Sequence, residues 1–145
     1  MSFIKSAKRT IRLESQAIAQ LAEQLNHEFS TACELCLNCE GRIVVTGMGK
    51  SGHIASKIAA TLASTGTPAF FMHPAEASHG DLGMLTSKDV VLALSNSGTS
   101  AEIILLIPLM QRLGTPLVSL TSDANSTLAR ASDAHLLVSV SEEAC

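Results

Sequence analysis

Aromatic residues are scarce in this chain: tryptophan and tyrosine are absent, and phenylalanine occurs only four times among 145 residues. Because 46% of the residues are nevertheless hydrophobic, the core must be built from alanine, valine, isoleucine and leucine. The sequence also lacks internal repeats, low-complexity tracts and linkers. A chain of this length and composition is predicted to form one domain with a single sizeable core.

Positive charge is limited as well, since ten Lys and Arg stand against thirteen Asp and Glu, for a formal net charge of −3. No basic cluster could follow a phosphate backbone, which argues against a nucleic acid as the main partner. No apolar run approaches the roughly 18 residues of a membrane span, and the N-terminus has no apolar signal segment. These absences predict a cytoplasmic protein without a membrane partner.

Cysteine is sparse but suggestively spaced, because Cys33, Cys36 and Cys39 form a C-x-x-C-x-x-C pattern. Such spacing is found in iron–sulfur and zinc sites. The segment 31–37 has a helical pattern, however, and steps of three keep side chains roughly on one helix face. A further ligand is also lacking nearby, with His27 the closest candidate. We therefore interpret the three cysteines as buried, reduced core residues.

The order of apolar runs predicts an α/β architecture. Apolar residues recur at helical spacing from about residue 4 to residue 39, which indicates one or two long helices that cover a sheet or pair with another subunit. Strands are then expected at 43–46, 69–72, 90–94, 117–120 and 136–140, with helices ending near 64, spanning about 100–113, and near 126–131. This alternation predicts a three-layer α/β/α sandwich of about five parallel strands. We divide the chain into an N-terminal helical segment, 1–40, and an α/β domain, 41–145.

The stretch 95–102 is the most informative loop, because small hydroxyl residues surround Gly98 between an apolar strand and a helix. Ligands of parallel sheets bind beyond the carboxyl ends of the strands. There, hydroxyls and backbone N–H groups at a helix N-terminus favour an anion, and phosphate is the natural ligand. The alternative is that Thr99 merely caps the helix, with Glu102 completing a capping box.

A second loop, 47–52, has the pattern G-x-G-x-x-G after the first strand. A dinucleotide-binding fingerprint would also have an acidic residue about 20 positions later, but the second strand ends in Met72-His73. A nucleotide P-loop would need a glycine where this chain has Val44. The remaining interpretation is a tight glycine turn carrying Lys50, whose ammonium faces a bound anion or developing negative charge.

Two further groups of polar residues follow strands. His73 and His79 flank a loop that contains Glu76, and two imidazoles with a carboxylate can hold zinc; alternatively, the histidines bind hydroxyls or order the loop. After the last strand, Glu142 and Glu143 bring carboxylates to the same edge of the sheet. On its own, that pair would be an ordinary solvated surface feature.

Taken together, these stretches resemble the sugar isomerase (SIS) domain family, and within it the arabinose 5-phosphate isomerases. The matching segments, which extend from about residue 30 to the end, are 47–53, 64–68, 73–84, 95–98 with Glu102, and 143–145. The resemblance implies a flavodoxin-like fold and the reversible conversion of D-arabinose 5-phosphate and D-ribulose 5-phosphate through an enediol, the first step of Kdo and lipopolysaccharide biosynthesis. It also implies a homo-oligomer, a tetramer by family, that requires no cofactor.

The resemblance assigns roles to individual residues. The catalytic positions are Lys50, Glu102 and Glu143. The substrate-binding positions are Ser51, Gly66, Thr67, His73, His79, Ser95, Asn96, Ser97 and Thr99, and His73 is also a position where zinc, often inhibitory, can bind. Family members carry another catalytic histidine, and many carry a pair of CBS domains, beyond the Glu-Ala-Cys segment. We therefore expect this chain to lack part of the family's domain and to be inactive alone.

Two other functions remain open. A SIS module of a transcriptional regulator binds a phosphosugar without catalysis, whereas acid–base groups such as Lys50, Glu102 and Glu143 favour an enzyme, because binding alone does not need them. An isomerase of a different phosphosugar, such as a heptose or a hexose phosphate, would use the same loops.

Overall fold

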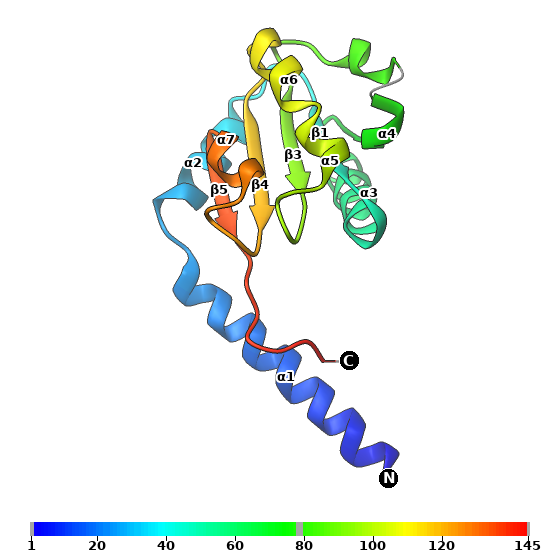
Figure 1. Ribbon diagram of the computed structural model, residues 1–145, viewed down its shortest axis with the longest axis vertical. Helices are drawn as coiled ribbons and strands as arrows, with labels where there is room; N and C mark the ends of the chain where they lie inside the picture. Colours follow the sequence, from blue (N-terminus) through cyan, green and yellow to red (C-terminus); the bar gives the residue numbers. More distant parts are fainter. Residues whose placement is uncertain (1, 78–79, 145) are drawn as a thin grey trace.

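The computed structural model describes residues 2–77 and 80–144, and its centre is a five-stranded parallel sheet in the order β2-β1-β3-β4-β5 (Figure 1). The strands are β1 (Ile43–Gly47), β2 (Ala69–Met72), β3 (Val90–Leu94), β4 (Leu117–Thr121) and β5 (Ala134–Leu137). This is the flavodoxin-like strand order. The predicted fold class, an α/β sandwich on five parallel strands, is confirmed.

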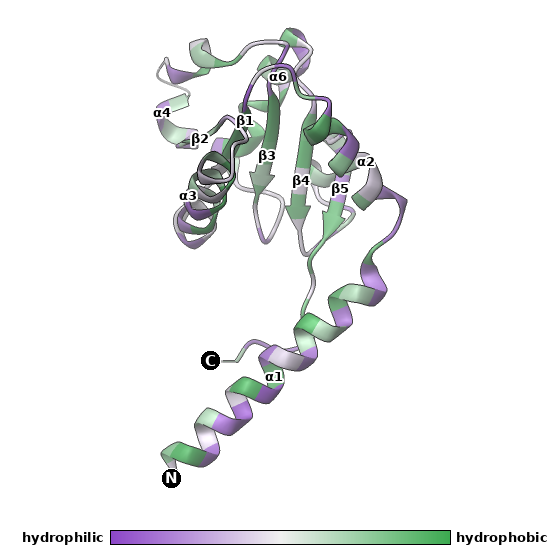
Figure 2. Cartoon of the chain, turned by 180° about the vertical axis from the view of Figure 1, so that it is seen from behind, coloured by the Kyte–Doolittle hydropathy of each residue, from purple (hydrophilic) through white to green (hydrophobic). Residues whose placement is uncertain are grey.

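Helices cover both faces of the sheet, and the strands are mostly apolar (Figure 2), with residues in the cores of both faces. One face packs against α2 (His27–Leu37) and α3 (Gly49–Ser64), and the other against α4 (Pro74–Ala77), α5 (Ala101–Ile104), α6 (Ile107–Leu113) and α7 (Thr127–Ala131). Alternate residues of a strand enter the two cores: Val44 packs on the second face and Val45 on the first. A strand buried on both sides forms a continuous aliphatic run in the sequence, which explains why β1 and β3 were predictable.

The expected helix 100–113 is interrupted in the structure. Pro108 has no N–H to donate to the carbonyl of Ile104, so the chain cannot continue the α-helical ladder there. Instead, Leu106 donates to Ile103 O at 3.0 Å, a tightened turn, and α6 begins anew with the proline in its first turn. The single long helix of the sequence-based prediction was therefore wrong.

Two other boundaries differ from expectation. The last strand lies at Ala134–Leu137 rather than 136–140, because β4 ends at Thr121, which is paired with Leu137. The apolar residues Val138 and Val140 that suggested the longer strand are exposed. The loop expected between residues 73 and 83 contains α4 and a 3₁₀ turn, η1 (Asp81–Met84).

The N-terminal segment forms two helices, of which only the second joins the sheet. α2 packs through the buried Ala32, whereas α1 (Phe3–Gln24), described over its whole length, buries no residue. α1 extends past the carboxyl edge of the sheet and runs beside the C-terminal tail (Figure 1). Its exposed residues Ile4, Ile11 and Ile18 recur every seventh position. In the described ranges, none of the helices combines the length and apolar character needed to cross a lipid bilayer.

Candidate functional site

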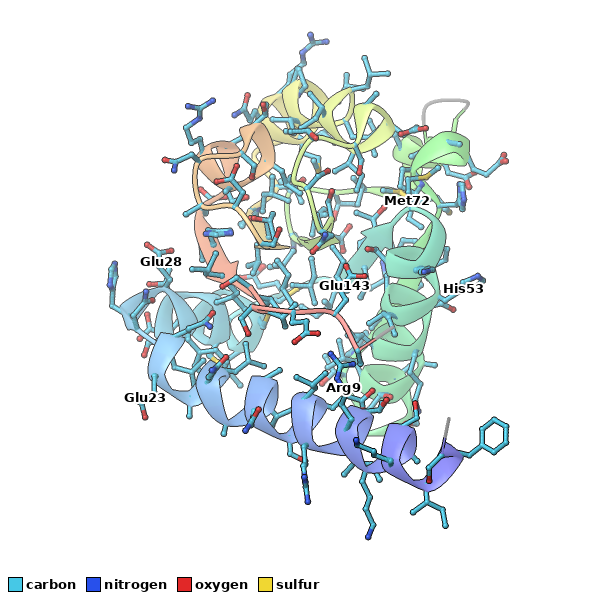
Figure 3. The ribbon with its side chains drawn as sticks, turned by 60° about the horizontal axis from the view of Figure 1, so that its bottom comes forward. Arg9, Glu23, Glu28, His53, Met72 and Glu143 are labelled. Atoms are coloured by element: carbon cyan, nitrogen blue, oxygen red, sulfur yellow. The ribbon has the colours of Figure 1, made fainter. Side chains whose placement is uncertain are left out.

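Polar segments gather at the carboxyl edge because all five strands end there. Lys50 lies in the first turn of α3, His73 directly follows β2, and Glu102 lies in the first turn of α5. The tail after β5 carries Glu143, which Figure 3 shows on the C-terminal segment that passes in front of this edge. The structure thus places the predicted site residues on separate loops of one edge, with the exceptions given below.

The β3–α5 loop (residues 95–100) is held together by its own hydroxyls. Ser95 is buried, and its Oγ accepts the N–H of Gly98 at 3.1 Å and lies 2.9 Å from Ser100 Oγ. Ser97 Oγ accepts the N–H and the hydroxyl of Thr99 at 3.2 and 3.0 Å. The buried Ser95 therefore shapes the loop, whereas the exposed Asn96, Ser97 and Thr99 face solvent.

The capping interpretation of this loop is wrong. The N-cap of α5 is Ser100, whose side chain makes no capping hydrogen bond in the described structure, and Glu102 is exposed. The N–H groups in the first turn of a helix have no intrahelical acceptor. The N–H of Ile103 donates to Ser100 O at 3.1 Å. The N–H groups of Ala101 and Glu102, which no side chain caps in the described structure, are therefore those that can bind an anion together with the exposed Ser97 hydroxyl.

Gly98 fixes the loop against α7. Its φ is +63°, and its carbonyl oxygen accepts the N–H of Leu128 at 3.0 Å. A Cβ atom at this position would overlap the side chain of Ser126, the N-cap of α7. The glycine therefore permits both the turn and the close approach of two loops.

A neighbouring segment that sequence reasoning missed supports the same loop from the side. The β4–α7 turn (residues 122–126) begins with Ser122, whose backbone N–H and hydroxyl both donate to Asn96 O, at 2.9 and 2.8 Å. The signal was present in the sequence, because the polar run Thr121-Ser122-Asp123 directly follows an apolar strand. Its significance depends on β4 lying next to β3.

The glycine turn after β1 has the predicted form. Gly49 has a φ of +54°, and a Cβ atom on Gly52 would lie 2.7 Å from Gly47 O. The glycines therefore let the start of α3 approach the end of β1 closely. Lys50 is exposed and Ser51 is partly buried, so the lysine ammonium projects from the N-terminal turn of α3.

His73 is ordered by its neighbours. Its Nδ1 accepts the N–H of Ala75 at 3.3 Å, and its ring lies edge-on to Phe71, with 6.2 Å between the ring centres. His79 lies outside the described residues. Within ranges 2–77 and 80–144, no three His, Cys, Asp or Glu side chains are arranged to hold a metal ion, so the described residues do not fit a zinc site at His73.

Gly66 and Thr67 lie at the opposite edge of the sheet. They connect the end of α3 to the start of β2, next to Phe70 and Arg42. The 16 residues of α3 separate them from Lys50 by about 24 Å at 1.5 Å per residue. Within one chain, the structure therefore does not bring these two predicted substrate contacts to the β3–α5 loop.

The three predicted catalytic residues are all exposed. In the part of the chain that the structure describes, no hydrogen bond or ion pair joins Lys50, Glu102 and Glu143. The tail that carries Glu143 is attached to α1, since Arg9 pairs with Glu142 and the Gln24 amide donates to Ser139 O at 3.5 Å. α1 thus positions the tail relative to the sheet.

The three cysteines of the C-x-x-C-x-x-C pattern are free thiols. They are partly buried rather than fully buried, with Cys36 and Cys39 packed against the core beneath α2. Burial raises the pKa of the Cys36 thiol, and the neighbouring Cys33 and Cys39 raise it further. Cys39 Sγ donates to Lys88 O at 3.4 Å.

Comparison with known proteins gives independent evidence on the family of this chain. The chain is 59% identical over 145 residues to the arabinose 5-phosphate isomerase KdsD of Pseudomonas aeruginosa and 53% identical over 143 residues to KdsD of Escherichia coli K12. These matches cover 100% and 99% of this chain but 44% of each relative, so the chain spans less than half the length of these curated relatives.

The solved structure of E. coli CFT073 c3406 in complex with arabinose 5-phosphate superimposes with a TM-score of 0.93 at 40% identity, covering 100% of this chain and 79% of that one. The model of the SIS domain matches residues 36–145, which is most of the chain. On this match and on the fold, the chain belongs to the SIS domain family.

Proposed function

We propose that this chain is the SIS part of an arabinose 5-phosphate isomerase, which interconverts D-arabinose 5-phosphate and D-ribulose 5-phosphate and supplies Kdo and lipopolysaccharide biosynthesis. Identities of 59% and 53% to two KdsD enzymes, and the likeness to a structure in complex with arabinose 5-phosphate, support the assignment. The observation that carries it is the arrangement at the carboxyl edge: an uncapped helix start, exposed hydroxyls, and both an ammonium and a carboxylate on adjacent loops.

In this proposal the β3–α5 loop holds the phosphate. The hydroxyl of Ser97, whose oxygen is held by the N–H and hydroxyl of Thr99, and the free N–H groups of the first turn of α5 are the donors. Ser95, which is buried, keeps the loop in shape through Gly98. Fixing the phosphate places the opposite end of the sugar, with its first two carbons, in a defined position, and such positioning lowers the barrier.

The chemistry requires one proton to move between adjacent carbons. A base removes the proton from C2 of the aldose, the C–H electron pair forms the C1=C2 bond of an enediol, and O1 takes a proton as its carbonyl bond opens. A proton is then delivered to C1 while O2 loses its proton and becomes the carbonyl oxygen of the ketose. Glu102 supplies the acid–base group, a contribution of typically 10²–10⁴ in rate. Lys50 stabilises the sugar oxygen that becomes negatively charged. Glu143 on the tail gives and takes the protons of the hydroxyl groups at C1 and C2.

The reaction is redox-neutral, so it requires no organic cofactor. Zinc enters the proposal only as an inhibitor, and because the described residues around His73 form no metal site, no zinc ligand is assigned among them. Chelation by EDTA should therefore leave the activity unchanged or raise it, and loss of activity on chelation would contradict this part of the proposal.

The working protein is proposed to be a homo-oligomer, a tetramer. The exposed apolar residues of α1, every seventh position apart, support pairing between copies. Gly66 and Thr67 lie at the far edge of the sheet, so they can contact the bound sugar only if a second copy supplies them. Light scattering of the intact protein tests this, and a monomer that retains full activity would contradict it.

The decisive experiment uses the intact protein that carries this chain. Solvent-proton exchange into ribulose 5-phosphate, followed by NMR in D₂O, should occur, and turnover of arabinose 5-phosphate should exceed that of ribose and glucose phosphates. Binding without exchange would instead identify a phosphosugar sensor. Equal or better turnover of another sugar phosphate would identify a different isomerase.

A further inference from the structure

His135, the second residue of β5, has no role in the proposed reaction but lies close to the site. Its imidazole is half-buried, and its Nε2 lies 2.9 Å from the hydroxyl of Thr121. Its backbone N–H donates to Glu28 Oε2 of α2 at 3.0 Å. The charged groups that face the ring are the carboxylates of Glu28 and Asp123.

The donors and acceptors around the Thr121 hydroxyl determine whether Nε2 of the His135 ring carries a proton. Its hydroxyl has one proton, which it donates to the carbonyl oxygen of Asp123 at 2.8 Å. The hydroxyl oxygen of Thr121 in turn accepts the backbone N–H of Asp123 at 3.1 Å. The remaining contact, with His135, must therefore be one in which the hydroxyl oxygen accepts, because its only proton is used. His135 is thus the donor, through Nε2–H.

Thr121 connects this contact to the β3–α5 loop. Its side-chain methyl carbon would lie 3.2 Å from a Cβ atom on Gly98, so strand end and loop are in close contact. The next residue, Ser122, makes the two hydrogen bonds to Asn96 O described above. A continuous series of contacts therefore leads from the imidazole through Thr121 and Ser122 to the loop.

We infer that His135 is a positioning residue that fixes the β4–α7 turn and, through it, the phosphate-binding shape of the β3–α5 loop. It touches neither sugar nor phosphate, so its loss should weaken binding rather than the proton-transfer step. The inference rests on the proposed function, in which this loop holds the phosphate.

The test compares two substitutions in the intact protein. In His135→Gln, the side-chain amide can donate to Thr121 as the imidazole does, whereas His135→Ala leaves the hydroxyl without this donor. The dissociation constants of arabinose 5-phosphate and of inorganic phosphate are measured by calorimetry, together with kcat. His135→Ala should weaken both affinities about two- to tenfold, as expected for one lost hydrogen bond, with kcat nearly unchanged. His135→Gln should bind close to wild type.

A second pair repeats the test from the other side of the contact. Thr121→Ser keeps the hydroxyl, although it loses the methyl group that lies against Gly98, and should bind close to wild type. Thr121→Val removes the contact with His135 together with the two hydrogen bonds to Asp123, so it should weaken binding at least as much as His135→Ala does. Equal affinities for wild type and His135→Ala, or equal weakening in His135→Ala and His135→Gln, would overturn the inference.

Failure of the positioning role of His135 can be distinguished from failure of the proposed function. If wild type binds no phosphosugar, the proposed function fails, and amide NMR shifts of Asn96 and Gly98 decide on the positioning role alone. Shifts that change in His135→Ala but not in His135→Gln support it. Shifts that stay the same in both variants overturn it.

Discussion

Gly98 and Ser126 lie in such close contact that a Cβ atom on Gly98 would overlap the serine hydroxyl. Ser126 is itself fixed, because its Oγ accepts the N–H of Ala129 at 3.3 Å as the N-cap of α7. The β3–α5 loop and the start of α7 therefore form one unit. A side chain at Gly98 cannot be accommodated without separating them.

Gly98→Ala tests this unit, and Gly114→Ala is its matched control. Both glycines have a positive φ, +63° and +69°, so both substitutions lose about 1–2 kcal/mol from the unfavourable backbone conformation. Among the described residues, nothing lies within 4 Å of a Cβ atom on Gly114. Gly98→Ala should therefore reduce the free energy of unfolding more than Gly114→Ala does, and should also abolish phosphosugar binding. Equal losses in urea unfolding, with binding retained in both, would contradict the packing argument.

Glu102→Gln tests the proposed proton transfer. The amide keeps the size of the side chain but cannot act as a base, so kcat should fall about 10²- to 10⁴-fold, with little change in the dissociation constant of the substrate. Ser97→Ala should show the opposite pattern, with weaker binding and a nearly unchanged kcat. Glu34→Gln, an exposed carboxylate on α2 away from this edge, serves as the control. A wild-type kcat in Glu102→Gln would contradict the acid–base role assigned to Glu102.

The buried carboxylate of Asp89 is expected to make the stability of the fold depend on pH. The side chain is 1% exposed, and its Oδ1 accepts the N–H of Arg42 at 2.7 Å, while Oδ2 accepts the N–H and the hydroxyl of Thr86 at 2.8 and 3.0 Å. Burial acts to raise the pKa of this carboxyl, but the hydrogen bonds from Arg42 and Thr86 outweigh it and lower the pKa. The ionised group therefore stabilises the fold fully above its unfolded pKa of about 3.9, and this stabilisation is lost as the pH falls through the folded pKa.

Asp89→Asn should lower the free energy of unfolding at pH 7 by about 1.5–3 kcal/mol, because the amide replaces an ionised acceptor of three hydrogen bonds. It should also lose less stability than wild type between pH 6 and acid pH. Urea titrations over this range measure both effects. Glu40→Gln, at the exposed ion pair with Lys88, should behave as wild type; an identical acid response in Asp89→Asn and wild type would contradict the assignment.

Cys36 should react slowly with alkylating agents. Its pKa is raised by burial and by the adjacent thiols, and only the thiolate is nucleophilic. Iodoacetamide labelling at pH 7.5, read by peptide mass spectrometry, should be slower at Cys36 than at a cysteine in an unstructured peptide, and should accelerate as the pH rises. Labelling of Cys36 as fast as the peptide would contradict the raised pKa.

Much of the fold could be predicted because β1 and β3 are continuous aliphatic runs followed by glycine- or serine-rich loops. The break before α6 was missed because Pro108 is acceptable in the first turn of a helix as well as at a break. The true end of β5 depends on where its partner β4 ends, which apolar composition does not reveal. Contacts such as His135 with Thr121 require the register of two strands, and this information is present only in the folded chain.

The resemblance identified site residues by type but not by position in space. Gly66 precedes a strand and Ser97 follows one, so in a parallel sheet they belong to opposite edges. The sequence therefore already indicates that the two residues are far apart within one chain, although motif matching assigns both to one substrate site. The assembled sheet makes it plain that such residues must be contributed by separate copies if both contact one sugar.

The attachment of the C-terminal tail to α1 has a consequence for regulation by assembly. Arg9 and Gln24 hold the segment that carries Glu143, and α1 exposes the apolar residues Ile4, Ile11 and Ile18 along its length. Any shift of α1 on association would therefore carry a carboxylate toward or away from the sheet. In the proposed oligomer, the distance of Glu143 from the sheet would therefore depend on whether the chains are associated.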